Sequence, residues 1–240
     1  MSGSPTRYKN GVTNVGSRDS MRMLQVPDPT LMHVFYDDFD RYVVGDWTIT
    51  TVEAGGGSAT EALTDADGGV LLITNDAADN DSDQFQKIGE SFLLTAGKKA
   101  MFKARFKVSD ATESDVFMGL AVTDTTLLGA TAGDGVTDGI FFQKDDGSTT
   151  LTCYCQKDTT TGQTSGTAGT MADDTYIIVA WYYDGVNKLE YYVDNVHKGT
   201  LDASSTYLPD TELTVSFAIM NGAAPAKTMS VDYILVAFER

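Results

Sequence analysis

The sequence predicts an all-β protein: one antiparallel two-sheet sandwich preceded by an extended N-terminal arm. From residue 34 onward, short stretches of alternating apolar and polar residues recur, separated by turn-forming Gly, Asn and Asp residues. No segment shows a helical period over ten residues. In the first 33 residues the apolar positions are scattered and follow neither the period of a strand nor that of a helix. The expected organisation is therefore an arm at 1–33 and a single sandwich at 34–240.

The arm is polar and rich in Gly, Ser, Asn and Thr, and its four basic and two acidic residues give it a net charge of +2. The total of −17 leaves −19 for the rest of the chain. A segment of this composition cannot build a core alone, so we expect a partner or a neighbouring subunit to hold it. The alternative is an arm folded back along its own domain. The residues expected to make the contacts are Arg7, Lys9, Val12, Val15, Arg18, Met21, Arg22, Met23 and Leu24.

The strands of the sandwich follow in order along the chain. The clearest is 99–108, where every second residue from Ala100 to Val108 is apolar and mostly Lys or Arg stands between them. Residues 175–183 are apolar on both faces, which predicts a central strand covered on both sides. The other candidates are 34–39, 47–53, 69–75, 84–88, 115–123, 138–143, 150–157, 189–193, 196 onward, 213–219 and 228–238.

Composition and charge exclude several classes of protein. No run of about 18 apolar residues exists, and the first residues lack the apolar stretch of a secretory signal, so we expect neither a membrane span nor export. The net charge of −17 opposes binding of the sandwich to nucleic acid. Cys153 and Cys155 would share one strand face, where a disulfide has poor geometry, so we expect two free thiols.

Two patterns at the ends of the sandwich resemble a known fold family. Near its start stands Phe35-Tyr-Asp-Asp-Phe-Asp40, followed by Trp47, and the chain closes with Met229-Ser-Val-Asp-Tyr-Ile-Leu-Val-Ala-Phe238. Similar opening and closing strands are common in concanavalin A-like lectins and glucanases, which the chain resembles in layout over residues 34–240. The resemblance implies a jelly roll in which the first and last strands pair. It does not decide function, because this fold hosts glycosidases, lectins and structural modules alike.

The catalytic pattern of the glucanases, Glu-x-Asp-x-x-Glu, is incomplete here. The nearest stretch is Glu113-Ser-Asp115-Val-Phe-Met118, in which Met118 replaces the second Glu. A glycosidase of this type needs both carboxylates, one as acid and one as nucleophile. The chain has neither a Gly-x-Ser-x-Gly elbow nor a phosphate-binding Gly-rich loop, and His33 and His197 have no evident Ser or Cys partner. We therefore expect a protein that is not an enzyme.

Two features could serve binding. Tyr182, Tyr183, Tyr191 and Tyr192 flank one hairpin, and the outward tyrosine of each pair could form a glycan patch or a cross-strand aromatic pair. We expect no cofactor and no metal. Were a calcium ion bound, Asp79, Asp81 and Asp83 would supply oxygen ligands at alternate positions. The segment lacks the Gly and the terminal Glu of a calcium loop, and a solvated acidic loop is the simpler interpretation.

In layout, an acidic jelly roll with an N-terminal arm resembles the decoration (cement) and minor structural proteins of tailed bacteriophage heads. This resemblance implies a virion protein, assembled in the host cytoplasm, that decorates and stabilises the capsid through its arm. Its expected partners are the major capsid protein or other virion subunits, and it would act as a homo-oligomer. The alternative function is a carbohydrate-binding module for adhesion to glycans.

Overall fold

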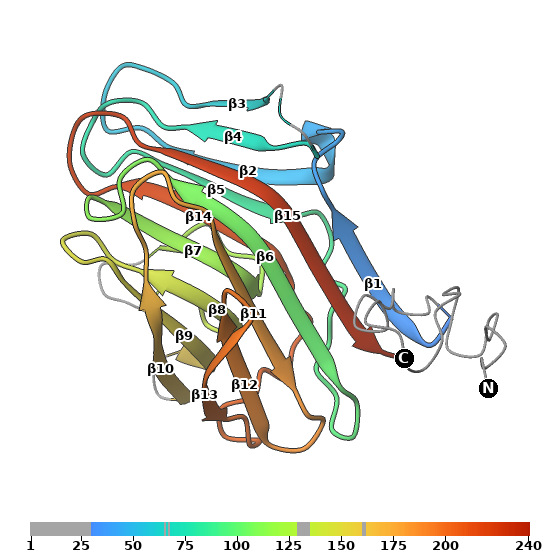
Figure 1. Cartoon of the computed structure of the whole chain (residues 1–240). Coiled ribbons are helices and arrows are strands. Elements are labelled where there is room, and N and C mark those ends of the chain that lie inside the picture. The colour runs from blue at the N-terminus through green and yellow to red at the C-terminus, as the bar shows by residue number, and fades with distance from the viewer. Residues whose placement is uncertain (1–29, 65, 67, 129–134, 160–161) are drawn as a thin grey trace, which may run out of the picture.

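The computed structural model describes residues 30–64, 66, 68–128, 135–159 and 162–240. Within these residues the chain forms an eight-stranded and a seven-stranded antiparallel sheet, packed as two layers (Figure 1). A single 3-10 turn, η2 (Val44–Asp46), precedes β2. No helix there is long and apolar enough to cross a membrane. The prediction of an all-β two-sheet sandwich is confirmed.

The eight-stranded layer, sheet A, has the order β13-β12-β11-β6-β15-β4-β3, and β1 also pairs with β15. Its strands are β1 (Met32–Asp37), β3 (Thr60–Leu63), β4 (Leu71–Thr74), β6 (Ala100–Val108), β11 (Ile177–Tyr183), β12 (Lys188–Val193), β13 (Val196–Asp202) and β15 (Thr228–Glu239).

The seven-stranded layer, sheet B, has the order β10-β9-β8-β7-β14-β5-β2. Its strands are β2 (Trp47–Val52), β5 (Ser82–Lys87), β7 (Ser114–Ala121), β8 (Gly139–Lys144), β9 (Thr150–Lys157), β10 (Gly162–Thr170) and β14 (Thr214–Asn221). Two of the fifteen strands, β3 and β10, lie where the sequence predicts none.

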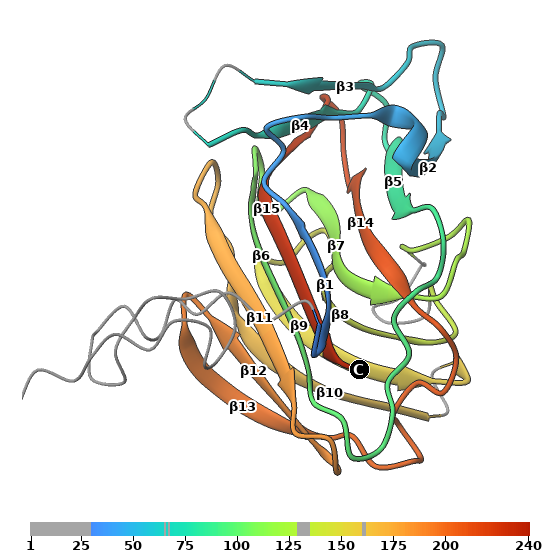
Figure 2. The same ribbon diagram turned by 90° about the vertical axis from the view of Figure 1, so that its right-hand side faces the viewer.

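The first and last strands lie side by side, as the resemblance implied. β1 pairs antiparallel with β15, from Met32 opposite Glu239 to Asp37 opposite Ile234 (Figure 2). The sandwich thus begins at Met32, two residues before the predicted boundary. Because Met32 lies opposite Glu239, the chain enters the sandwich at the same end of sheet A at which it leaves.

The main core fills the space between the two sheets. On β6 the positions alternate as predicted: Ala100 to Val108 are buried at every second residue, while the residues between them are only half-buried. Trp47, Phe85 and Phe217 pack together at one end of this core, with ring centroids of Phe85 and Phe217 4.8 Å apart. All three side chains come from sheet B, and large aromatic rings such as these bury much apolar area in a core.

The strand covered on both faces is not the predicted one. In β11, Ile177, Val179 and Trp181 are buried, but Ile178 and Tyr182 on the other face are half-buried, because no described layer covers sheet A from outside. Every residue of β7 and β8 is buried instead. Their outer faces are covered by the connection between them, described below.

Candidate functional site

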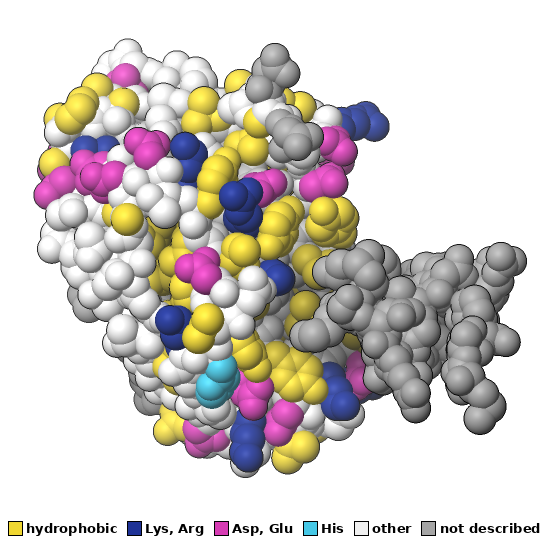
Figure 3. All heavy atoms as spheres, in the orientation of Figure 1, with side chains coloured by type: hydrophobic (Ala, Val, Ile, Leu, Met, Phe, Trp, Pro, Cys, Tyr) yellow, Lys and Arg dark blue, Asp and Glu magenta, His cyan; other side chains and the backbone are white. Residues whose placement is uncertain are grey.

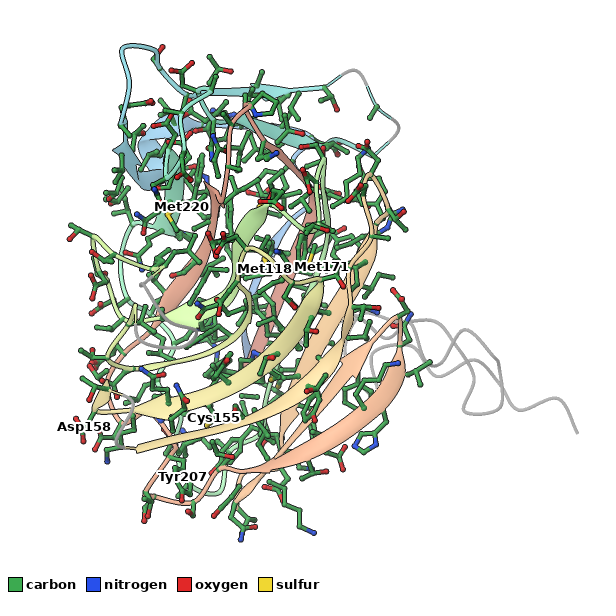
Figure 4. All side chains as sticks on the ribbon, turned by 90° about the vertical axis from the view of Figure 1, so that its left-hand side faces the viewer. Met118, Cys155, Asp158, Met171, Tyr207 and Met220 are labelled. Atoms are coloured by element: carbon green, nitrogen blue, oxygen red, sulfur yellow. The ribbon has the colours of Figure 1, made fainter. Side chains whose placement is uncertain are left out.

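The outer face of sheet B is the face on which the glucanase-like stretch lies. Glu113 precedes β7, and Asp115 and Phe117 lie on the outer face of that strand, while Met118 points into the main core with Cys155 and Met171 (Figure 4). A second carboxylate is therefore missing from this strand. Position 117, which lies on the outer face, is Phe, and position 118 is Met and faces inward. The chemistry of a paired acid and nucleophile has no counterpart at this stretch.

Asp115 itself is engaged in structure. It is buried, and its carboxylate accepts a hydrogen bond of 2.7 Å from the backbone N–H of Asp146 in the β8–β9 turn. Burial, reinforced by the charge of Asp146, raises the pKa of Asp115 to about 6. A carboxylate held in this way fixes the turn against β7.

A row of stacked aromatic rings crosses the outer face of sheet B. The centroids of Phe117 and Phe141 are 4.5 Å apart, and those of Phe141 and Tyr154 are 5.4 Å apart. Such a row would suit sugar stacking if it were exposed. All three side chains are buried, Tyr154 at 7% exposed, in a second apolar cluster separate from the main core.

The chain itself covers this row. We call the described residues 122–128 and 135–138, which connect β7 to β8, the covering segment. Its Leu127, Leu128 and Val136 are buried against the aromatic row. Sequence reasoning missed this feature, since 122–138 has the Thr, Gly and Asp composition of a surface loop and only the pair Leu127-Leu128 hints at burial.

Three buried glutamines on sheet B hold the covering segment in place. Gln84 accepts a hydrogen bond from the N–H of Leu127 (2.5 Å), and Gln156 donates one to the carbonyl of Val136. Gln86 makes two bonds: its Oε1 accepts from the N–H of Asp124 (2.8 Å) and its Nε2 donates to the carbonyl of Val122 (3.0 Å). Backbone groups that a loop would otherwise bury unpaired are thereby satisfied.

The predicted tyrosine patch is divided between two faces. Tyr182 and Tyr192 lie on the outer face of sheet A, but Tyr183 and Tyr191 are buried in the main core and cannot take part in a surface patch. Strand alternation requires this, because adjacent residues point to opposite faces. Tyr182 lies opposite Glu190 across the strand pair, diagonal to Tyr192.

The outward part of the patch has polar neighbours. Glu190 accepts a hydrogen bond of 2.6 Å from the hydroxyl of Tyr192, which raises the pKa of Tyr192 to about 12. The ring of His197 lies edge-on to Tyr192 at 5.3 Å. Figure 3 shows that hydrophobic side chains on this side of the molecule are interspersed with charged ones. The face therefore offers half-buried aromatic rings beside hydrogen-bonding groups.

The three aspartates proposed for calcium do not act together. Asp79 is exposed, Asp81 is buried, and Asp83 is fully buried on β5, where its Oδ1 accepts a hydrogen bond of 2.6 Å from Thr51. The structure instead brings Asp81 together with Glu53 and Asp76, with one carboxylate oxygen of each within 4.8 Å of the others. Glu53 could not be found by spacing, because the pairing of β2 with β5 brings it to Asp81 from a distant segment.

Burial dominates the chemistry of Asp83. Burial, together with the nearby carboxylates Glu61 and Glu53, raises the pKa of this carboxyl to about 7, while the Thr51 hydrogen bond acts in the opposite sense. Glu61 lies on β3 of sheet A, so carboxyl groups of both layers meet at this edge of the sandwich.

The remaining candidate residues are placed as follows. All nine predicted contact residues of the arm, from Arg7 to Leu24, lie outside the described residues. His33 stacks on Phe92 with centroids 4.6 Å apart, so its ring packs on the domain. Cys153 and Cys155 are free, buried thiols, as predicted. Burial raises the pKa of both.

Comparison with known proteins places the fold. No family model matches the chain, and no curated protein matches it. Among solved structures, an endo-1,3-β-glucanase from Streptomyces sioyaensis is similar at 16% identity and a TM-score of 0.60, over 85% of this chain and 95% of the glucanase. A protein of unknown function from Shewanella oneidensis MR-1 is similar at 13% identity and a TM-score of 0.58, over 95% and 97% of the two chains. The carbohydrate recognition domain of Emp47p is similar at 14% identity and a TM-score of 0.57, over 90% and 99%.

These similarities establish the class of fold, a concanavalin A-like jelly roll shared by glucanases and lectin domains. At such low identities they carry no residue roles, and the fold alone is common to all of them.

Proposed function

We propose that this chain is a non-enzymatic structural protein of a bacteriophage virion, which decorates and stabilises the capsid and is anchored through residues 1–33. The observation that carries the proposal is the closed outer face of sheet B. The covering segment fills this face with Leu127, Leu128 and Val136, and the stretch that resembles the glucanase motif has Phe117 and Met118 in place of a second carboxylate. A domain built in this way suits a role based on attachment.

The layout of the chain supports attachment through the N-terminal segment. The sandwich is strongly acidic, whereas residues 1–33 carry a net charge of +2 and scattered apolar side chains. The residues that precede Met32 can span roughly 100 Å when extended, enough to cross a neighbouring subunit. Since the segment joins the sandwich at Met32, beside the C-terminal strand, an anchor there would hold the domain by one end. A homo-oligomer would present several arms to the capsid at once, so its overall affinity would exceed the weak affinity of a single arm.

The test is co-sedimentation with virions depleted of this protein. The full chain should bind and pellet with the particles, whereas a variant lacking residues 1–30, which retains β1, should stay in solution while giving the same thermal unfolding profile. A full-length variant with Arg7, Lys9, Arg18 and Arg22 changed to Gln measures the contribution of the basic charges. Undiminished binding of the truncated protein would refute anchoring by the arm.

A second candidate function is carbohydrate binding, favoured by the outward Tyr182 and Tyr192 beside Glu190. Aromatic rings at a surface with adjacent hydrogen-bonding groups are the usual components of a sugar site, and Tyr182 and Tyr192 are half-buried on the outer face of sheet A. Glycan-array binding that survives deletion of residues 1–30 and is lost in Tyr182→Ala/Tyr192→Ala would support this function. The matched control is Tyr207→Ala, which removes a tyrosine from outside the patch.

A further inference from the structure

At one end of the sandwich, β3 of sheet A and β5 of sheet B each direct a carboxyl group into the space between the layers. Glu61 on β3 lies opposite Ile73, and Asp83 on β5 lies opposite Ile219. Both isoleucines belong to the main core, and residues directly opposite each other in a strand pair share one face of the sheet. Glu61 and Asp83 therefore both point inward, and neither proposed function uses them.

The Asp83 carboxyl group is enclosed with a donor at only one of its oxygens. Its side chain is fully buried, and Oδ1 accepts a hydrogen bond of 2.6 Å from the hydroxyl of Thr51 on β2. Oδ2 is also buried and has no donor among the described residues. A buried carboxylate oxygen without a donor is costly, so this position favours a protonated oxygen that can itself donate a hydrogen bond.

The titratable groups that face Asp83 are all acidic. Glu61 approaches from β3 closely enough to share a hydrogen bond with Asp83, and Glu53, which follows β2, adds a further negative charge. Tyr42 contributes a buried hydroxyl that makes no hydrogen bond within the described part of the chain. None of the four ion pairs of that part includes Asp83, Glu61 or Glu53. Burial and repulsion between carboxylates therefore both favour keeping a proton here, in line with the raised pKa of Asp83.

We propose that Asp83 and Glu61 share one proton between the two layers, and that loss of this proton loosens β3 from the edge of the sandwich. With the proton on Oδ2, Asp83 donates a hydrogen bond to the Glu61 carboxylate, and both oxygens of Asp83 have a partner. When the proton leaves to water, two carboxylates face each other in a buried space and repel. β3 is the element that can yield, because it is a four-residue edge strand that pairs with β4 alone.

The dependence on pH has a definite sign. The pKa of Asp83 is raised from 3.8 to about 7 in the folded protein, chiefly by burial. The stability that its protonated form contributes is therefore fully present below about pH 4 and is lost as the pH rises to about 7. The end of the sandwich at β3 should thus be closed at acidic pH and loosened above pH 7.

The experiment is hydrogen exchange of the full chain, measured by mass spectrometry at pH 5 and pH 8 and corrected for the intrinsic exchange rate at each pH. Protection of the β3 amides should fall by about tenfold or more at pH 8, while the central strand β6 keeps its protection. Asp83→Asn should abolish this fall, because its amide donates permanently to Glu61 while its oxygen still accepts from Thr51. Asp79→Asn is the matched control, since it removes one exposed charge from the nearby β4–β5 loop and should leave the fall unchanged.

Glu61→Gln offers an independent variant that keeps the Asp83 carboxyl group. Its amide can donate to an ionised Asp83, so β3 should stay protected at pH 8. The carboxyl carbon of Asp83, followed by carbon-13 NMR, should also titrate at a lower pH in this variant than in the wild type. Equal protection of β3 at both pH values in the wild type would overturn the proposal. So would an unchanged titration of Asp83 in Glu61→Gln, which would indicate that burial alone holds the proton.

Discussion

Truncation of Leu127 to Ala tests whether the covering segment is a packed part of the domain. The Leu127 side chain is fully buried against the outer face of sheet B. The change removes three buried carbon groups, worth about 2.4 kcal/mol at about 0.8 kcal/mol each. A residual cavity adds to this, and partial relaxation of a connecting segment subtracts from it. We expect a loss of about 2–3 kcal/mol in the free energy of unfolding, within the usual range for such substitutions.

The assay is urea unfolding followed by circular dichroism, with a thermal scan as the second measurement. For a domain of this size the expected loss lowers the unfolding temperature by about 5–10 °C. Leu93→Ala is the control, because Leu93 is 44% exposed and should lose less than about 1 kcal/mol. A free energy of unfolding for Leu127→Ala within about 0.5 kcal/mol of the wild-type value would refute this reasoning. The covering segment would then not be packed on the outer face of sheet B, and that face would be open.

Three further predictions concern single positions. The pKa of Asp115 is raised in the folded protein to about 6 from an ordinary value of 3.8, so ionisation of this group opposes folding, and its contribution to stability falls as pH rises from about 4 to 6. The free energy of unfolding of Asp115→Asn should therefore rise relative to that of the wild type by about 2–3 kcal/mol between pH 4 and pH 7, as urea unfolding would measure; a difference that does not change with pH would contradict the raised pKa. Gly119→Ala should destabilise the fold by about 3 kcal/mol or more, because its Cβ would lie 2.5 Å from the backbone carbonyl oxygen of Ile140, whereas Gly45→Ala meets nothing and should be near neutral in the same thermal scan. Cys153 and Cys155 should resist iodoacetamide at pH 8 until the chain unfolds, as mass spectrometry would show; rapid labelling of the native protein would refute their burial.

The sequence predicts those parts of the fold in which a local pattern and the tertiary environment agree. β6 was predictable because its apolar residues alternate and one of its faces is open to solvent. β10 (Gly162–Thr170) was not, since it consists of small and polar residues with no apolar period. It forms because β9 offers a partner edge, and because Gly166 leaves room for the hydroxyl of Tyr191, 2.4 Å from where a Cβ would lie.

The candidate sites were less predictable than the strands, because sites depend on which segments meet. Alternation alone separates Tyr182 from Tyr183, so the outward half of the tyrosine patch follows from sequence once the strand is placed. The grouping of Asp81 with Glu53 and Asp76 does not follow from sequence, because it depends on the pairing of β2 with β5 and on the path of the chain between β4 and β5.

The covering segment on sheet B limits which face of the sandwich a partner can contact. Its outer face is filled at the centre by its own covering segment, so a flat contact has to use sheet A, where no described layer covers the outer side chains of β6, β11 and β12. That face also carries Lys103, Arg105 and Lys107 in a row on an otherwise acidic domain, and the guanidinium of Arg105 lies 3.9 Å from the centroid of the Tyr176 ring. Basic groups beside half-buried surface rings can meet an acidic protein surface or a sugar, whereas the acidic loops elsewhere would repel a like-charged partner. Both proposed functions therefore predict that charge reversal at Lys103 impairs a contact made by the sandwich more than charge reversal at Lys198 on β13, the edge strand of the same sheet. Binding of the two variants to particles or to glycans tests this prediction.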